Sequence, residues 1–443
     1  MTSNPTLKIA VLGAGPAGLS AARYLSDYDD VQVDVIEKET HLGGLQRSFD
    51  FHGDHYDVGT ILFFGHHGLV EAFPFLAEQM VPIKYKPVSI NPAGSYDRYP
   101  FTIKRYLKDN GLVTAAKSFI DLLFCKFTCG AKDSVATYAK YYMGDTVYRK
   151  SGLKKYIHRL HDLEDEQLDV EFAKKRLLLI ERQSFRRMLS AALPFTKTKK
   201  KTIAGGRLVR PESGFEKMFD DIRADVEQRG ATIHLSKNVR SVRKTEEGFD
   251  LDIDGQVHGY DRVISTIPIP DMLRLIGEEP KTEVQTRNLI SLFYTGNFAQ
   301  PGNTFFNFSN EGAWKRITVF SRFYKPTQKG SDYFTVEVTS NDVSPAKIAA
   351  AAKDFEQHAN KVGLFDGTPS LEGSHVSYHA YPVYRRGQST AVELEKTRLR
   401  EFGIDLLGRQ GNFEYVISNV VAKRAAELSG KIADSNSLVT SCS

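Results

Sequence analysis

The sequence predicts an α/β protein that combines a Rossmann-like dinucleotide-binding domain with an inserted helical segment and a second, mostly antiparallel β-sheet domain. Three observations support this fold class. A glycine-rich loop lies between an apolar run and a helical pattern near the N-terminus. Apolar residues recur at helical spacing from about residue 104 to 192. Alternation typical of strands dominates from about residue 285 to 384.

The N-terminal element is a predicted βαβ unit. Residues 7–12 (LKIAVL) are expected to form a buried strand, residues 17–25 a helix, and residues 31–36 (VQVDVI) a second strand. The intervening loop has the form GxGxxG. In such a loop the first glycine permits a tight turn, the second lets the backbone approach a pyrophosphate, and the third lets helix and strand pack closely.

Four further residues indicate more closely which ligand is expected. Glu37, directly after the second strand, can accept both ribose hydroxyls of an adenosine and would repel a phosphate at the 2′ position. A second glycine pair, Gly43-Gly44, lets the backbone pass close to a long ligand. Arg47 can meet a phosphate. The pattern therefore predicts an adenine dinucleotide.

Glycine loop, acid and Gly-Gly-x-x-Arg-Ser together resemble the FAD-binding signature of the amine oxidase, protoporphyrinogen oxidase and UDP-galactopyranose mutase superfamily. The segments 135–177, 214–242, 260–272 and 406–428 are similar to later blocks of that superfamily. The resemblance implies a Rossmann-like FAD-binding domain of the glutathione-reductase (GR2) type, FAD as the cofactor and no metal. It implies the following cofactor-binding residues: Gly13, Gly15, Pro16, Ala17, Gly18, Glu37, Lys38, Gly43, Gly44, Leu45, Arg47, Asp57, Gly59, Thr60, Val239, Gly408, Arg409 and Asn419.

Within this set, the resemblance assigns particular places. Val239 is expected against the adenine, and Gly408 and Arg409 precede a helix whose N-terminus would face the flavin pyrimidine and stabilise negative charge there. Two departures from the superfamily pattern are present. Asn419 stands near a position that is often acidic, and Thr60 stands where the sugar mutases continue with glycine and a flavin-facing histidine.

The candidate substrate residues lie in the second sheet. The blocks 314–323 and 380–387 resemble segments of mutase-like flavoproteins of surface polysaccharide synthesis, and they supply the candidate catalytic residues Arg316, Tyr381, Tyr384 and Arg385. An aromatic and arginine lining suits an anionic, partly planar ligand. In the alternative interpretation, the tyrosines pack at a strand end and the arginines are solvated.

The FAD-binding blocks, the helical region and the predicted second sheet divide the chain into segments. The predicted segments are a first FAD-binding part (1–95), a helical insertion (96–204), a second FAD-binding part (205–270), the antiparallel-sheet substrate domain (271–384), a third FAD-binding part (385–431) and a disordered tail (432–443).

Three functions remain open at this point. The favoured one is an FAD-dependent oxidoreductase that transfers hydride from a small organic substrate to tightly bound FAD, since no second glycine loop for a nicotinamide is visible. The alternative is a redox-neutral nucleotide-sugar mutase or related surface-glycan enzyme that uses reduced flavin N5. The third is a non-catalytic flavin-binding protein.

Composition and charge limit which partners and which cellular compartment are expected. A net charge of +5 fits a small, anionic substrate or a nucleotide sugar, and no nucleic-acid partner is expected. Three cysteines and no apparent signal peptide or spanning segment favour a cytoplasmic protein, with the membrane surface as an alternative place. Residues 104–132 mix basic and apolar side chains; a helix packed against the FAD-binding domain is favoured there over a membrane-surface helix.

Overall fold

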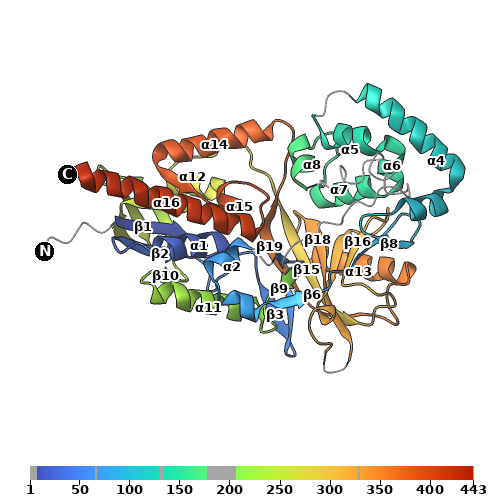
Figure 1. Cartoon of the computed structure of the whole chain (residues 1–443), viewed down its shortest axis with the longest axis horizontal. Coiled ribbons are helices and arrows are strands. Elements are labelled where there is room, and N and C mark those ends of the chain that lie inside the picture. The colour runs from blue at the N-terminus through green and yellow to red at the C-terminus, as the bar shows by residue number, and fades with distance from the viewer. Residues whose placement is uncertain (1–6, 65–66, 130–132, 177–205, 328–329, 443) are drawn as a thin grey trace.

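A five-stranded parallel sheet is built from three distant parts of the chain. The computed structural model describes residues 7–64, 67–129, 133–176, 206–327 and 330–442. Its first sheet has the order β10-β2-β1-β14-β20, and every neighbouring pair is parallel. Figure 1 labels three of these strands, β10, β2 and β1. The strands are β1 (Leu7–Leu12), β2 (Val31–Ile36), β10 (Thr232–His234), β14 (Arg262–Ser265) and β20 (Ile404–Leu406).

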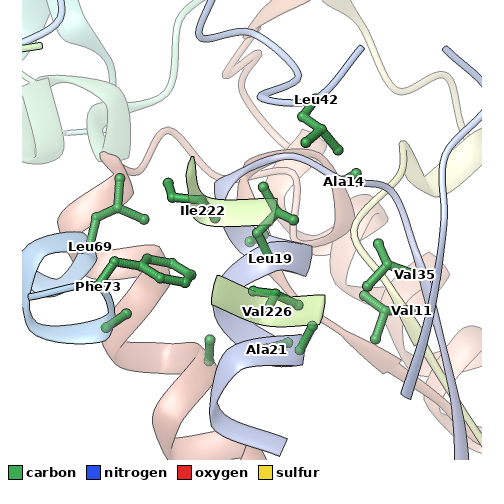
Figure 2. Packing of buried hydrophobic residues seen from close by; sticks show 14 of the residues in the cluster. Val11, Ala14, Leu19, Ala21, Val35, Leu42, Leu69, Phe73, Ile222 and Val226 are labelled. Atoms are coloured by element: carbon green, nitrogen blue, oxygen red, sulfur yellow. The ribbon is translucent and has the colours of Figure 1, made fainter. Parts of the chain in front are cut away.

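Helices cover one face of this sheet because their apolar residues share one core with β1 and β2. The helices are α1 (Pro16–Leu25), α2 (Gly68–Ala72), α3 (Leu76–Gln79), α11 (Gly214–Gln228) and α16 (Ser418–Cys442). Figure 2 shows Leu19 of α1 beside Ile222 of α11, with Leu69 and Phe73 packed from the side. Small residues of α1, such as Ala21, are fully buried, which lets α16 run close alongside (Figure 1).

The opposite face of the parallel sheet carries a second core. An antiparallel sheet of β11 (Val239–Lys244), β12 (Phe249–Ile253) and β13 (Gln256–Tyr260) packs there with α12 (Ile269–Leu275) and α14 (Gln388–Phe402). Leu12, Leu251 and Leu273 contribute to this core and are almost fully buried. The sheet is therefore covered on both faces, as a parallel sheet requires.

The second large sheet has seven strands in the order β19-β15-β18-β17-β16-β7-β8. Its pairs are antiparallel except for β16 with β7. The strands are β7 (Pro87–Ile90), β8 (Tyr96–Arg98), β15 (Thr286–Gly296), β16 (Thr304–Asn307), β17 (Trp314–Val319), β18 (Asp332–Ser340) and β19 (Ser370–Pro382). Helix α13 (Pro345–Lys361) packs on one face, where Trp314 and Phe355 are fully buried.

A helical region lies beyond this sheet, at the end of the molecule away from α16 (Figure 1). It contains α4 (Ile103–Thr128), α5 (Val135–Met143), α6 (Asp145–Lys150), α7 (Leu153–His161) and α8 (Val170–Arg176). Its core includes Tyr148 and Ile157 and continues onto Phe308 of the second sheet. The basic run 197–201 of the sequence lies outside the described residues.

Short elements join the two large sheets. Strands β3 (Ser48–Phe51) and β4 (Asp54–Asp57) form a hairpin, and β5 (Phe63–Phe64), β9 (Arg207–Val209) and β6 (Val81–Ile83) form a three-stranded sheet. A single 3₁₀ turn, η1 (Phe320–Arg322), follows β17, and α15 (Gly408–Gly411) follows β20. These connections place the turn after β4 against the second sheet.

Three expectations from the sequence are corrected by the fold. The tail predicted to be disordered from residue 432 continues α16 to Cys442, because Ile432 is buried against the α1 side of the core. Residues 87–95, assigned to the first FAD-binding part, contribute β7 to the second sheet. Helix α4 packs on α5 and α6 and not on the dinucleotide-binding domain.

None of the helices in the described part of the chain combines the length and apolar content that crossing a bilayer requires.

Candidate active site

The first glycine loop makes a turn that only glycine fits. Gly13 follows β1 with a φ of +102°, a conformation that side chains disfavour. A β-carbon added at Gly18 would lie 1.9 Å from the carbonyl oxygen of Gly13, so helix α1 approaches the strand end as closely as a backbone can. Gly15 caps α1 without a side chain, and the first amide groups of the helix therefore point toward the loop.

The second glycine pair lies against the first loop. The amide of Gly43 donates to the carbonyl oxygen of Ala14 at 3.0 Å. A β-carbon on Gly44 would come within 3.5 Å of the Cα of Gly15, although the two glycines are 29 positions apart in the chain. The two loops thus face each other through backbone atoms alone, which is the surface that a pyrophosphate needs for close approach.

Glu37 is fixed at the C-terminal end of β2. Its carboxylate accepts from the amide of Ala14 at 2.8 Å and from the amide of Glu39 at 3.0 Å. The segment before β11 runs beside it, since the amide of Lys237 donates to the Glu37 carbonyl oxygen. Val239 begins β11 two residues later and is half-buried. The predicted ribose and adenine residues are therefore neighbours, whereas Lys38 is exposed.

Arg47 is the clearest sign of a missing anionic partner. Its guanidinium lies over the Phe49 ring at 4.9 Å, and its buried Nε has no hydrogen-bond partner in the described part of the chain. Burial, with the positive charge of Arg47, lowers the pKa of His375 on β19 to about 4, so that this imidazole is neutral at physiological pH. Together with the glycine cradle, this orphaned donor fits the phosphates of a bound dinucleotide.

The C-terminal motif closes onto the same loops. A β-carbon on Gly408 would lie 2.8 Å from the side chain of Ala17, and one on Gly411 would lie 2.5 Å from the carbonyl oxygen of Ser265. Helix α15 therefore packs closely between the start of α1 and the end of β14. The Arg409 guanidinium donates to the carbonyl oxygens of Ala380 and Val416, so this side chain orders the surrounding backbone.

Two other predicted cofactor residues have side chains that are engaged within the protein. The Asn419 Oδ1 accepts from the amide of Gly68 and thereby joins α16 to α2. The buried carboxylate of Asp57 accepts from Ser48 Oγ and from Arg210 Nε, both at 2.6 Å. Burial raises the pKa of Asp57 even though Arg210 opposes that shift. The Asp57 side chain therefore fixes the turn that leads to Gly59 and Thr60.

A buried charged cluster faces that turn from the second sheet. Glu337 of β18 is fully buried and accepts from Arg316 Nε at 2.6 Å and Arg316 Nη2 at 2.8 Å. Lys315 Nζ lies 2.8 Å from the same carboxylate and donates to the Tyr381 hydroxyl at 2.7 Å. The amide of Thr60 also donates to Glu337 at 3.1 Å.

The two cations of this cluster keep Glu337 ionised although it is buried. Burial alone would raise the pKa of Glu337, but Arg316 and Lys315 hold it at about 2. Two cations share one carboxylate, which leaves a net positive charge. Arg316 keeps 21% of its side chain exposed, whereas Glu337 is inaccessible. Arg316 is accordingly the group of the cluster that can meet a substrate.

The structure brings together only part of the predicted catalytic set. Arg316 and Tyr381 share the cluster, and the Tyr381 ring stacks on Tyr415 at 5.8 Å. Tyr384 is buried nearby, and its hydroxyl accepts from the amide of Tyr415 at 2.7 Å. Arg385 is exposed and is not among the groups that contact Glu337.

Sequence reasoning missed Glu337, the residue that organises this cluster, and Arg210, which holds Asp57. A signal for Glu337 exists in the sequence. It stands in the otherwise apolar strand pattern DYFTVEVTS, at a position where an acid is rarely buried without a partner. The adjacent pair Lys315-Arg316 in another strand supplies that partner.

Fold and site together define a dinucleotide-binding protein with a substrate sheet beside its glycine loops. Comparison with known proteins then specifies the family. The model of the flavin-containing amine oxidoreductases matches residues 16–300. The chain belongs to this family, which confirms the resemblance seen in the sequence, and FAD is its cofactor.

Individual relatives agree with this assignment. A solved structure of reduced UDP-galactopyranose mutase has a TM-score of 0.78 at 17% identity, with 97% of this chain and 94% of that chain covered. A redesigned putrescine oxidase has a TM-score of 0.60 at 15% identity, covering 97% and 100%. Both show the fold alone.

A curated relative matches the sequence locally. The zeta-carotene desaturase of Solanum lycopersicum is 45% identical over 62 residues, which is 14% of this chain. The match spans about a tenth of the length of that desaturase.

Proposed function

We propose that this protein is an FAD-dependent oxidoreductase that removes hydride from a carbon atom in a CH–CH or CH–NH group of a small organic substrate. When bound, FAD would supply a two-electron acceptor for that hydride; the second hydrogen of the substrate group would leave as a proton, and dioxygen or another oxidant would take up the electrons. Gly15, Gly44 and Arg47 would hold the dinucleotide, and the turn at Gly59-Thr60 would lie between the cofactor and the second sheet.

The observation that carries this proposal is the pairing of Arg316 with Glu337, which leaves the cluster with a single net positive charge. Arg316 makes two charge-assisted hydrogen bonds to Glu337, and Arg385 is exposed away from the cluster. A nucleotide-sugar mutase needs free cations for a diphosphate, whereas hydride transfer needs orientation and a water-poor surface. Here Tyr381, Tyr384 and Tyr415 supply that aromatic surface.

The remaining positive charge bears on the substrate. Lys315 and Arg316 together exceed the charge of Glu337 by one. A substrate with one acidic group would complete the cluster, and this supports a small anionic substrate. Tyr381 would position it, because its hydroxyl lies between Lys315 and Glu337.

A panel of donors tests the proposal. Flavin-loaded protein is mixed without oxygen with a diamine, a polyene and a reduced tetrapyrrole, and the loss of oxidised-flavin absorbance is followed. Bleaching by one donor, with peroxide or another reduced acceptor appearing on re-oxygenation, is the expected result. Failure of every donor in a wider panel of amines, polyenes and acids would count against it.

With the donor that reduces the wild type, Tyr381→Phe is expected to slow flavin bleaching by about tenfold. The change keeps the ring stacked on Tyr415 but removes the hydrogen bonds of the hydroxyl to Lys315 and Glu337, a loss worth about 1.5 kcal/mol or more. Tyr378→Phe on the same strand is the matched control, because Tyr378 is 60% exposed. Equal rates in the two variants would remove Tyr381 from the site.

A further inference from the structure

Helix α4 carries a continuous exposed apolar face. Seven large side chains on it are at least 43% exposed, and Leu112 and Phe127 reach 80% and 88%. The others are Val113, Phe119, Ile120, Leu123 and Phe124. A soluble surface seldom gathers so many large apolar side chains in one place.

The geometry of the helix makes this one surface. Gly111 interrupts α4 with a φ of +76°, so residues 112–128 form a helix of their own. At about 100° per residue, the exposed apolar positions fall within an arc of about 140°. Ser118, Leu122 and Cys125 occupy the opposite side and are buried toward α5 and α6. The helix is thus anchored by one face and presents the other outward.

Positive charge borders the apolar arc. Lys117 lies at one edge of it and Lys126 at the other, and both are exposed. Lys104 and Lys108, on the turn before Gly111, are exposed as well. The two acidic residues of α4 are not free at the surface: Asp109 is 9% exposed and pairs with Arg105 at 2.9 Å, and the Asp121 carboxylate accepts from the amide of Thr146 at 2.7 Å. The outward charges on α4 are therefore cationic.

We propose that α4 docks this protein onto an anionic lipid bilayer surface, with its apolar face inserted among the acyl chains and its lysines at the headgroups. An apolar stripe flanked by lysines matches the layered chemistry of that surface. A second copy of the chain fits less well, since a symmetric contact through this face would bring the same lysines together. The inference is independent of the proposed reaction, because α4 lies at the outer end of the molecule (Figure 1).

Vesicle sedimentation tests the docking surface. Flavin-loaded protein is centrifuged with vesicles of neutral phosphatidylcholine, or of phosphatidylcholine mixed with anionic phosphatidylglycerol. The protein is expected to sediment with the anionic vesicles. The double variant Ile120→Asp/Phe124→Asp is expected to reduce that binding by at least about tenfold. Both side chains are two-thirds exposed in the free protein and would be buried only when they insert into the membrane.

The controls separate docking from misfolding. Leu394→Asp replaces an equally exposed apolar residue on α14 and should leave binding unchanged. The double variant should retain its FAD and its elution volume. Absence of binding to the anionic vesicles would overturn the proposal, and so would equal binding to neutral and anionic vesicles. A wild-type dimer that the double variant converts to a monomer would assign the face to a second copy instead.

Discussion

Gly15→Val is expected to yield a folded protein that binds FAD about a hundredfold more weakly than the wild type, or loses it on purification. Gly15 has ordinary backbone angles, with a φ of −77°, and the nearest atom to an added β-carbon is the Cα of Gly44 at 3.9 Å. The protein itself therefore tolerates a side chain there. The side chain would instead occupy the space between the two glycine loops where the pyrophosphate must approach.

Cofactor content and stability are measured together in this experiment. The FAD released from denatured protein gives the occupancy per chain, and urea unfolding of the cofactor-free form gives the stability. Gly18→Ala should lower both, because its β-carbon would lie 1.9 Å from the Gly13 oxygen. Gly430→Ala on α16, which has no neighbour within 4 Å, should leave the FAD content unchanged and raise the stability slightly, because alanine favours a helix over glycine. Wild-type FAD affinity in Gly15→Val would show that the cofactor does not pass between the loops.

Glu337→Gln is expected to lower the free energy of unfolding by about 3 to 5 kcal/mol. The substitution keeps the shape of the side chain but leaves Lys315 and Arg316 without their buried counter-charge. Such charges lose their hydration on folding and recover it only through a partner. Glu311→Gln is the matched control, because its carboxylate pairs with Lys361 at an exposed site and should matter little. Equal effects of the two substitutions would contradict the buried cluster.

The same group gives the wild type a defined dependence on pH. The folded protein holds the pKa of Glu337 at about 2, below its ordinary value of 4.5. Its ionised form therefore stabilises the fold fully above pH 4.5, and this contribution of about 3 kcal/mol is lost as the pH falls toward 2. Unfolding curves of Glu337→Gln should lack that part of the pH dependence.

The dinucleotide-binding half could be predicted from the sequence because its signals are local. Gly13, Gly15 and Gly18 lie close together where a strand turns into a helix, and each acts through the absence of a side chain. The second pair, Gly43-Gly44, needs only one further assumption, that the chain returns to the first loop. Residue type and spacing suffice for such features.

The substrate side could not be predicted to the same degree, because its contacts join distant segments. Glu337 meets Lys315 and Arg316 through strand pairing, and it meets Thr60 across 277 positions of the chain. Arg385 has the right residue type, but the turn after β19 leaves it exposed. The full length of α16 could not be predicted for a related reason. Ile432 packs into the core, but the residues around it in the sequence are mostly polar and favour a disordered tail.

An enzyme that takes electrons from its substrate differs from a redox-neutral mutase in what it does to a nucleotide sugar. Flavin-loaded protein, fully oxidised in one sample and reduced with dithionite in the other, is incubated without oxygen with UDP-galactopyranose, and the sugar nucleotides are separated. If the protein is an oxidoreductase, we expect UDP-galactopyranose to remain unchanged in both samples. Conversion to the furanose ring form by the reduced sample alone would contradict it and would make this protein a redox-neutral mutase.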